Sequence, residues 1–544
     1  MCHEGPEEQG GWTRREIVRC LQRSAAGTSL PRQLPPTPVK AWELHPPASS
    51  IRPASSTSPK PPSSKGARHA LDLPRRLRRP RRGRPLARRP PHAGPGPPRP
   101  RPRPRPDRVT VGDRTYIADD QGRALQWRGF NLADKSSRGT HAFADIHESD
   151  LKDMAGRGFN LARLAFFWDD LEPTPGHYDR GYLTKMRRIL DWAGRYHIKV
   201  ILDAHQDVYG PHFGSRGVPD WATRDEGLPF EPKPDDWFSE YFEPSVQTAF
   251  DHLYKDADFR AAHARMWMTV ASALGRHPAL LGYDLMNEPF AKFLAGEDLP
   301  TAAARFEATE LTELWNRLAR AIRLVDHRSW VFVEPTVIVG VGVPTQMGHI
   351  DDPHAGYAPH FYETAMETGA DYDPNGTFIP AYEAAISDYP TRHRMPVIVG
   401  EWGGNPYLPH ARQFVTDMTA SLDRFSSGWT WWQWCRGGGY CFLDRAGVAK
   451  PNAQLLVQPY ARAVAGDPLK YAYDPATRTY TLTFRTRHNA KGPTRITVPS
   501  DTYPGGYRVD VQGSKASWDD HGQTVSVHTH GRAGATYRVT ITPR

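Results

Sequence analysis

The chain has 544 residues, with 70 Lys and Arg against 60 Asp and Glu, which gives a formal net charge of +10 at pH 7. This length accommodates two or three domains. The sequence contains no run of about 18 apolar residues, which excludes an ordinary membrane-spanning helix, and no Cys/His spacing that suggests zinc. No cofactor is expected.

The positive charge is concentrated in residues 1–106. This segment contains 23 of the 52 prolines, 23 of the basic residues and only 6 of the acidic ones, so residues 107–544 carry 47 basic against 54 acidic residues. Proline removes backbone donors and neighbouring arginines repel one another, so the segment is predicted to be disordered. A nucleic-acid partner is not expected for the remainder of the chain.

Three interpretations of this N-terminal segment stay open. It is a basic arm for RNA, an anionic membrane or a cell wall; a solvated tail; or noncoding sequence translated from a start codon placed too far upstream. The alternation of Arg and Pro over 98–106 is what a GC-rich stretch coding for Ala and Leu gives in a shifted frame. N-terminal sequencing that finds residues 1–106 intact in the native protein would contradict the third interpretation.

From residue 107 to residue 465, short apolar runs alternate with stretches whose apolar residues have helical spacing. Eight such runs with helices between them indicate a closed parallel (β/α)₈ barrel, or TIM barrel, rather than an open sheet. The predicted strands are 124–133, 160–168, 199–207, 280–289, 330–335, 355–363, 396–403 and 428–434. The predicted helices are 150–158, 181–196, 257–275, 302–325, 409–425 and 451–464.

Residues 466–544 show a different pattern. Runs such as 477–487, 507–513 and 535–543 alternate polar and apolar residues, with Gly, Asp and Pro turns between them. This pattern predicts a small antiparallel β-sandwich. Carbohydrate binding and a structural role are both open for it. We favour the structural role, because Trp518 is its only tryptophan.

Polar side chains recur at the carboxyl ends of the predicted strands. A barrel brings all these ends to one mouth, where active sites are built, so we expect the polar side chains to share a cleft. They are Asn131, Arg163, His205, Asp207, Asn287, Glu288, Glu334, His360, Tyr362, Glu401 and Trp432, with Trp431 as its alternative.

Glu288 and Glu401 are the candidate catalytic residues. They end the fourth and seventh strands, which face each other across a barrel, and glycoside hydrolysis needs two such carboxyl groups. Glu288 is predicted to be the general acid/base and Glu401 the nucleophile. A separation of about 5 to 5.5 Å would mean that the anomeric configuration is retained. A single glutamate in such a place would more simply be a salt-bridged or solvated residue.

The neighbouring polar groups fit the same chemistry. Arg163 and Tyr362 can keep Glu401 ionised, whereas Glu288, with a negative neighbour and no cation of its own, should have a raised pKa. Asn287 can bond the 2-hydroxyl of the sugar. Further substrate contacts are expected from Lys135, His205, Asp207, His360 and Trp432, although either histidine alone could equally be a hydrogen-bonded core residue.

The motifs GFNLADKSS (129–137), LDAHQDVYG (202–210), MNEP (286–289), HFYE (360–363) and GEWGG (400–404) resemble glycoside hydrolase family 5. HQDVYG and GVPDWAT (217–223) narrow the resemblance to the endoglycoceramidases. It implies metal-free, retaining cleavage of the β-glucosidic bond between an oligosaccharide and ceramide. It also implies an acid/base at Glu288, a nucleophile at Glu401, and glucose contacts at Lys135, Asp207, Asn287, Tyr362 and Trp432.

Other members of the family remain alternatives, such as a β-glucanase or a β-glucosidase acting on another lipid or sterol glycoside. A binding protein without catalytic activity is a further alternative from another class. The resemblance implies an exported protein, although residues 1–106 contain no recognisable signal peptide. We expect a monomer whose partner is a glycolipid or oligosaccharide.

Two local features bear on a lipid substrate and on export. The segment 228–250 is rich in aromatic residues, which either line a groove and touch a membrane transiently or pack against the barrel. Phe290 and Phe293 are predicted to extend such a groove. Cys435 and Cys441 bracket a Gly-rich loop, and they either form a disulfide or remain two free thiols.

Overall fold

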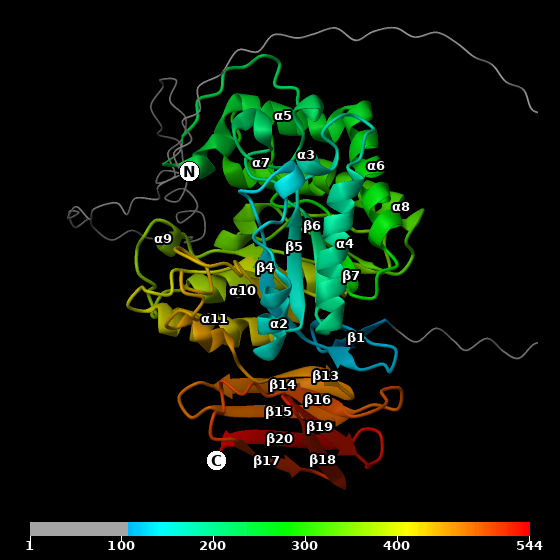
Figure 1. Cartoon of the computed structure of the whole chain (residues 1–544), viewed down its shortest axis with the longest axis vertical. Coiled ribbons are helices and arrows are strands. Elements are labelled where there is room, and N and C mark those ends of the chain that lie inside the picture. The colour runs from blue at the N-terminus through cyan, green and yellow to red at the C-terminus, as the bar shows by residue number, and fades with distance from the viewer. Residues whose placement is uncertain (1–106, 234) are drawn as a thin grey trace, which may run out of the picture. The chain divides into compact units, whose positions relative to one another are not determined.

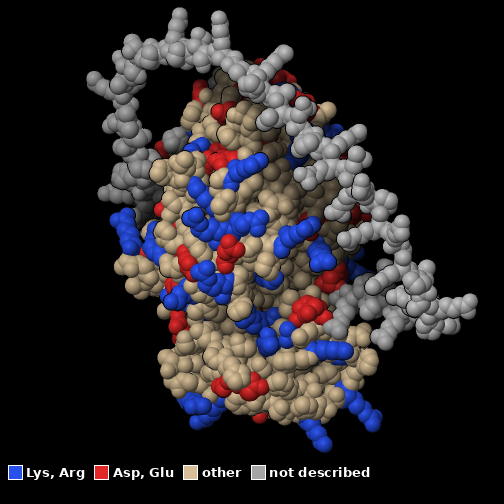
Figure 2. Space-filling model, turned by 45° about the vertical axis from the view of Figure 1, so that its right-hand side comes forward, with Lys and Arg blue, Asp and Glu red and all other residues tan. Residues whose placement is uncertain are grey.

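The computed structural model describes residues 107–233 and 235–544. The predicted disordered segment, residues 1–106, lies outside these ranges. In the part of the chain that the structure describes, no helix is both long enough and apolar enough to cross a bilayer. On the face shown in Figure 2, basic and acidic side chains are interspersed over these residues.

The predicted barrel is confirmed. Its parallel strands are β4 (Trp127–Leu132), β5 (Leu161–Phe166), β6 (Lys199–Ala204), β7 (Leu280–Asp284), β8 (Trp330–Val333), β9 (Ala355–Tyr357), β10 (His360–Phe361), β11 (Ile398–Trp402) and β12 (Gly428–Trp431). The predicted strand 355–363 forms two short pieces. β9 pairs with β8 and β10 pairs with β11, so this segment closes the sheet on itself (Figure 1).

Helices cover the outside of the barrel, apart from a single turn over Thr364–Glu367 that lies at the mouth (Figure 1). They are α2 (Glu148–Gly156), α3 (Trp168–Leu171), α4 (Arg180–Arg195), α5 (Pro244–Lys255), α6 (Ala257–Leu274), α7 (Leu299–Phe306), α8 (Thr312–Arg323), α9 (Thr364–Glu367), α10 (Phe378–His393) and α11 (Ala411–Phe425). A π-helical turn, Glu307–Leu311, joins α7 to α8. At the start of α4, Asp179 accepts hydrogen bonds from the backbone N–H groups of Gly181 and Tyr182, which is ordinary N-capping.

The predicted helix over 451–464 is wrong. Ala453–Leu456 is a 3₁₀ helix and Tyr460–Val464 is strand β13. Pro459 explains the difference, because proline has no N–H for the helix and keeps the residue before it out of the helical region. Four α-helices were not predicted. α3 and α9 have four residues each, α5 lies partly within the aromatic segment, and α10 contains Pro390.

The C-terminal β-sandwich is also confirmed. One sheet has the order β18-β19-β16-β13-β3 and the other the order β14-β15-β20-β17. The strands are β3 (Ala124–Leu125), β13 (Tyr460–Val464), β14 (Gly466–Asp474), β15 (Thr479–Thr486), β16 (Thr494–Thr497), β17 (Tyr507–Gln512), β18 (Ala516–His521), β19 (Thr524–Thr529) and β20 (Thr536–Pro543). Strands β13 to β20 are the orange and red strands of Figure 1.

The sandwich includes segments that precede the barrel in the sequence as well as segments that follow it. β3, which precedes the first barrel strand, pairs with β13, and the hairpin of β1 (Arg108–Val111) and β2 (Arg114–Ile117) buries Val109 and Tyr116 in the sandwich core. The hydroxyl of Tyr460 donates to the carbonyl of Gly158 at 2.9 Å. These contacts support the predicted structural role, whereas Trp518 lies 44% exposed on strand β18.

Candidate active site

Glu288 and Glu401 approach the same point from opposite sides of the barrel mouth. Glu288 follows β7 in a left-handed backbone conformation, with φ +43°, and its backbone N–H donates to Glu334 at 2.8 Å. Glu401 lies within β11 and is buried. Because β7 and β11 are far apart in the order of the sheet, the facing of these two residues is a product of barrel closure.

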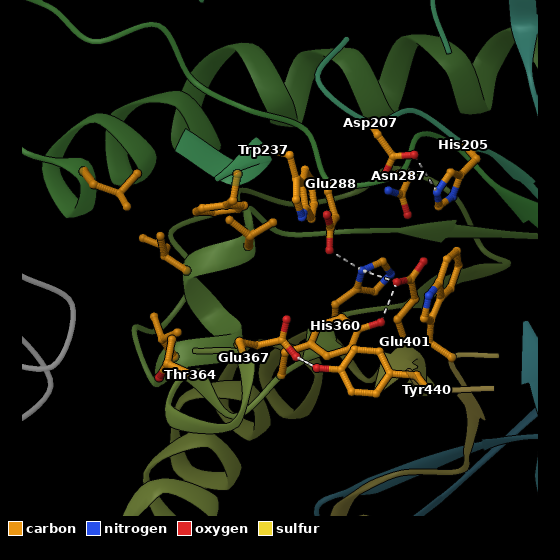
Figure 3. Close-up of a pocket in the computed structure, with 18 of the residues that line it drawn as sticks. His205, Asp207, Trp237, Asn287, Glu288, His360, Thr364, Glu367, Glu401 and Tyr440 are labelled. Carbon is orange, nitrogen blue, oxygen red and sulfur yellow. Dashed lines mark hydrogen bonds and ion pairs between the residues drawn. The ribbon is translucent and has the colours of Figure 1, made fainter. Parts of the chain in front are cut away.

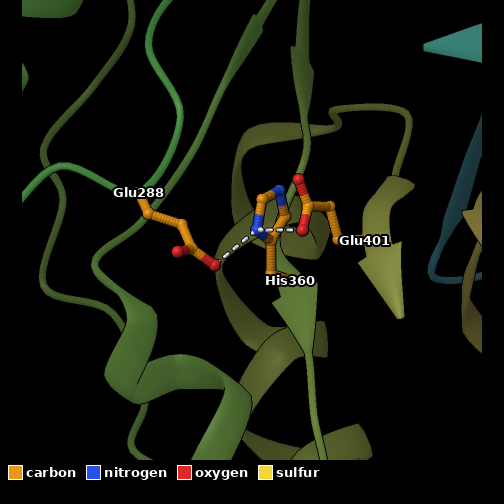
Figure 4. A group of neighbouring side chains, drawn as sticks. All are labelled: Glu288, His360 and Glu401. Carbon is orange, nitrogen blue, oxygen red and sulfur yellow. Dashed lines mark hydrogen bonds and ion pairs between the residues drawn. The ribbon is translucent and has the colours of Figure 1, made fainter. Parts of the chain in front are cut away.

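His360 lies between the two carboxylates (Figure 4). Its Nδ1 is 2.9 Å from Glu288 Oε1 and 3.8 Å from Glu401 Oε2. One oxygen of each glutamate and a ring nitrogen of His360 lie within 4.8 Å of one another. Carboxylates this close leave no room for a water molecule between the sugar and the base, as inversion requires, and they match the arrangement of retaining enzymes.

Arg163, on β5, holds Glu401 from below. Its Nη1 donates to Glu401 Oε1 at 2.6 Å, and the hydroxyl of Tyr362 donates to Glu401 Oε2 at 2.8 Å. Both oxygens of Glu401 are therefore fixed. The same guanidinium, which is 1% exposed, also pairs with Asp203, Asp284 and Glu334. Four carboxylates thus share one buried cation.

The surroundings push the pKa values of the two glutamates apart. Burial raises the pKa of Glu288, and repulsion from Glu401 and Glu334 adds to it, although His360 opposes the shift. Burial also favours the neutral form of Glu401, but the charges of His360 and Arg163 outweigh it and lower the pKa of Glu401. This division suits one group that carries a proton and one that stays ionised.

The expectation that Glu288 has no cation of its own is wrong. Burial disfavours the charged form of His360, but Glu334, Glu401 and the bond to Glu288 raise the pKa of its ring well above the usual value. His360 is therefore a cation in contact with Glu288. Its charge lowers the pKa of Glu288 without cancelling the effect of burial.

Two sets of three side chains in the site bring possible metal-ligand atoms close together. One is Glu288, His360 and Glu401, and the other is Asp203, Asp284 and Glu334, each with its ligand atoms within 4.8 Å of one another. In the second group the Arg163 guanidinium bonds all three carboxylates, with contacts of 2.8 to 3.0 Å. It supplies the positive charge that a metal ion would bring, so this donor set does not fit a metal.

Nine of the twelve side chains expected at the site line a single cleft, whereas Arg163, Asn131 and Glu334 are buried and do not line it. At one end Lys135 Nζ lies 2.9 Å from Asp207 Oδ1 and 4.6 Å from the ring centre of Trp432. The ring of His205 stacks on Trp432 with 5.4 Å between centres. Trp431, the alternative to Trp432, is buried and lies outside the cleft.

Asn287 and His205 also line this end of the cleft. Arg163 donates to Asn287 Oδ1, and Asn287 Nδ2 donates to the carbonyl of Gln206, which uses one of its two amide hydrogens. Burial and Lys135 oppose charge on His205, but Asp203 and Asp207 raise its pKa to about 9. Nε2 of His205 is buried and lies 3.7 Å from Asp207 Oδ2, so the amide of Asn287 is the donor that this pair offers to a hydroxyl group.

The opposite end of the cleft is apolar. Figure 3 shows Asp207 and His205 on one side of the glutamates and Thr364 on the other. Carbon-only side chains lie on the side of Thr364 in Figure 3, and the apolar residues that line the cleft are Leu299, Val337, Ile338, Val341 and Phe238. Trp237, which is 41% exposed, lines the cleft too, and it also lines a neighbouring hollow with Lys135 and Asp207. The expected extension by Phe290 and Phe293 is wrong: neither lines the cleft, and Phe290 is buried against Tyr241.

The aromatic segment 228–250 divides between its two interpretations. Trp237 and Phe238, on a 3₁₀ helix over Trp237–Phe242, line the cleft. Tyr241 and Phe250 are buried and stack on each other in the barrel core. The aromatic content of the segment alone does not tell which rings face the cleft and which face the core.

Cys435 and Cys441 form a disulfide. The loop that it closes carries Tyr440, which lines the cleft and donates to Glu367 of α9. Neither Tyr440 nor Glu367 was predicted, because both follow the strand ends by several residues. Asp203, Asp284 and Glu334 around Arg163 were not predicted as a group either, although two acidic residues inside apolar strands are a recognisable signal.

A parallel barrel whose mouth brings together two close carboxyl groups, one with a raised and one with a lowered pKa, has the arrangement of a retaining glycoside hydrolase. Comparison with known proteins gives the family. Residues 118–438 match cellulase (glycosyl hydrolase family 5), and residues 458–541 match the glycoside hydrolase family 5 C-terminal domain. The chain belongs to glycoside hydrolase family 5.

Three relatives are informative. Endoglycoceramidase I of Rhodococcus hoagii is 25% identical over 78% of this chain and 87% of its own length. The structure of endo-glycoceramidase II from Rhodococcus sp. in complex with ganglioside GM3 is 31% identical and covers 79% of this chain and all of its own, with a TM-score of 0.71. The lactosyl-enzyme intermediate of that enzyme is 32% identical over 79% of this chain and 99% of its own, with a TM-score of 0.69.

Proposed function

We propose that this protein hydrolyses the β-glucosidic bond between the oligosaccharide and the ceramide of glycosphingolipids. The observation that carries the proposal is the division of one cleft: hydroxyl-binding groups lie at one end, aliphatic side chains at the other, and the carboxylate pair lies between them (Figure 3). A sugar bonded to an alkyl chain has the same division. The names of the relatives support this substrate class.

Glu401 acts as the nucleophile and Glu288 as the acid/base. Glu401 attacks the anomeric carbon, the glycosidic bond breaks, and Glu288 gives its proton to the departing ceramide oxygen. Glu288, now ionised, takes a proton from water, and the water oxygen displaces Glu401 from the anomeric carbon. Arg163 and Tyr362 hold the attacking carboxylate in place through the contacts described above. The sum is hydrolysis of one bond with retained configuration.

Substrate binding is shared between the two ends of the cleft. Trp432 offers an apolar face to a pyranose ring, and Lys135 and Asp207 reach the outer hydroxyl groups. Asn287 donates to the 2-hydroxyl, a bond that strengthens in the transition state. The aliphatic side chains of the cleft contact the alkyl part of the ceramide. Trp237 lines the cleft and is 41% exposed, a position suited to transient contact with the membrane that contains the substrate.

Activity should follow a bell-shaped pH profile. Glu401 must be ionised, so kcat/KM falls as the pH drops through its lowered pKa, below the usual range of a glutamate. Glu288 must carry a proton, so kcat/KM also falls as the pH rises through its raised pKa. Rate measurements on a lactosyl substrate across the pH range test this. With Glu288→Gln and a leaving group that needs no proton, the alkaline limb should be lost from the formation of the glycosyl-enzyme; an unchanged limb would assign it to another group.

The substrate class is tested with the full chain and lactosylceramide in detergent micelles, with products identified by mass spectrometry. We expect intact lactose and intact ceramide, and neither product from Glu401→Gln. A wild-type enzyme that leaves lactosylceramide intact but cleaves cello-oligosaccharides or a sterol glycoside would contradict the substrate and keep the retaining mechanism.

We further propose that the protein is a monomer that is exported from the cell. The disulfide between Cys435 and Cys441 supports export, because disulfides persist mainly in oxidising compartments. Recovery of the native protein from the cytosol alone, with both thiols reactive, would contradict export. Elution as a dimer in size-exclusion chromatography would contradict the monomer.

A further inference from the structure

One wall of the apolar end of the cleft is a strap, residues 336–346, between β8 and β9. Val337–Val341 form a 3₁₀ helix within it, and Val337, Ile338, Gly340 and Val341 line the cleft. The strap contains no strand, so no ladder of backbone hydrogen bonds sets its position. The 3₁₀ helix packs against α10 and β10, where Ile338 and Val339 are buried, and a polar contact holds the two ends of the strap.

That contact is the carboxylate of Glu307. Its Oε1 accepts the backbone N–H of Thr336 at 2.9 Å and the hydroxyl of the same residue at 2.7 Å. Its Oε2 accepts the hydroxyl of Thr345 at 2.8 Å and the backbone N–H of Gln346 at 2.7 Å. One carboxylate thus holds both ends of the strap, and all four donors point at it.

The location of Glu307 explains how it reaches both ends. It begins the π-helical turn between α7 and α8 and is 1% exposed, and such turns often occur at functional sites. Leu299, on the preceding α7, lines the same end of the cleft. Glu307 therefore joins the strap to the helix that completes the wall, although Glu307 itself does not line the cleft.

We infer that Glu307 is a positioning residue that fixes the aliphatic wall of the cleft and thereby sets the preference for an aglycone with an alkyl chain. The inference rests on the proposed function and adds to it the residue on which recognition of the chain depends. The branched side chains of Val337, Ile338 and Val341 bind an alkyl chain only when they are held in register with Leu299. Loss of one end of the strap moves them and leaves the carboxylate pair in place.

Glu307→Gln tests this inference. The amide keeps one acceptor and turns the other oxygen into a donor, which then faces donors at one end of the strap. Dodecyl β-lactoside reports the alkyl-binding end, and β-lactosyl fluoride, whose leaving group is one atom, reports the sugar end alone. We expect KM for dodecyl β-lactoside to rise about tenfold, the effect of leaving buried donors unsatisfied, with kcat unchanged and both constants for the fluoride unchanged.

Glu172→Gln is the matched control. Glu172 is also fully buried and accepts the indole N–H of Trp168 and the backbone N–H of Gly176, but the segment that it holds does not line the cleft. It should lose stability without any change in the ratio of the two KM values. If Glu307→Gln fails to fold, Thr345→Ala removes only one of the four bonds, and a smaller rise in KM for the dodecyl substrate is expected.

Two results would overturn the inference. One is an equal change in KM for both substrates in Glu307→Gln. The other is an unchanged KM for dodecyl β-lactoside in both Glu307→Gln and Thr345→Ala. Lactosylceramide is assayed in parallel. A wild-type enzyme that cleaves both lactosides but not lactosylceramide contradicts the proposed function alone, because the alkyl lactoside still decides the role of the strap.

Discussion

Replacement of Glu401 by Gln should lower kcat for every substrate by about 10⁴-fold or more, the usual loss when the catalytic nucleophile is removed. The amide has no negative charge with which to attack the anomeric carbon, and no glycosyl ester forms. The side chain keeps its size between Arg163 and Tyr362, so the fold should survive. Steady-state rates on β-lactosyl fluoride and lactosylceramide, together with a thermal unfolding curve, test this.

Glu288→Gln should behave differently, and the contrast defines the two roles. Fluoride needs no proton to depart, so the first step still proceeds with β-lactosyl fluoride. The second step is slow because no base activates water. The variant should therefore accumulate a lactosyl group on Glu401, visible as added mass of the intact protein, while lactosylceramide stays uncleaved. A lactosylated Glu401→Gln variant, or equal losses of Glu288→Gln on both substrates, would contradict the assignment.

The location of the site could be predicted from the sequence because a barrel converts order along the chain into position. Residues at the carboxyl ends of strands reach one mouth whatever the loops between them do. For this reason Glu288, His360 and Glu401 could be placed in one cleft from their strands alone. Which of them touch could not be predicted, since the contact of His360 with Glu288 depends on side-chain directions within the closed barrel.

The residues that line the sides of the cleft were less predictable than the residues at the strand ends. They come from connections between strands and helices, where an aromatic residue can face either the cleft or the core. Trp237 and Tyr241 are four residues apart on one 3₁₀ helix, yet the first lines the cleft and the second is buried. Periodicity in such a short, irregular element gives no warning of this. The strap held by Glu307 has no sequence signal at all.

Replacement of Arg163 by Met should destabilise the fold strongly. The substitution leaves Asp203, Asp284, Glu334 and Glu401 buried without their shared cation. Removal of one partner from a buried ion pair costs about 3–5 kcal/mol, and here four carboxylates lose the same partner. Denaturant unfolding of the wild type and the variant gives the difference in the free energy of unfolding. Arg128→Met is the control, because Arg128 is equally buried and forms its ion pair with a single carboxylate, Asp423.

The loss in the free energy of unfolding of Arg163→Met should also depend on pH, whereas a loss caused by a packing cavity alone would not. In the wild type the lowered pKa of Glu401 contributes stability that is present above the pKa of the unfolded chain and is lost as the pH falls through the folded value. Without Arg163, burial and mutual repulsion raise the pKa values of these carboxyls, so the folded variant binds protons and loses stability as the pH rises. The deficit should therefore widen between pH 5 and pH 8, to a greater degree than in Arg128→Met. A deficit that is the same at both pH values would show that lost packing, and not the shared charge, is what Arg163 contributes.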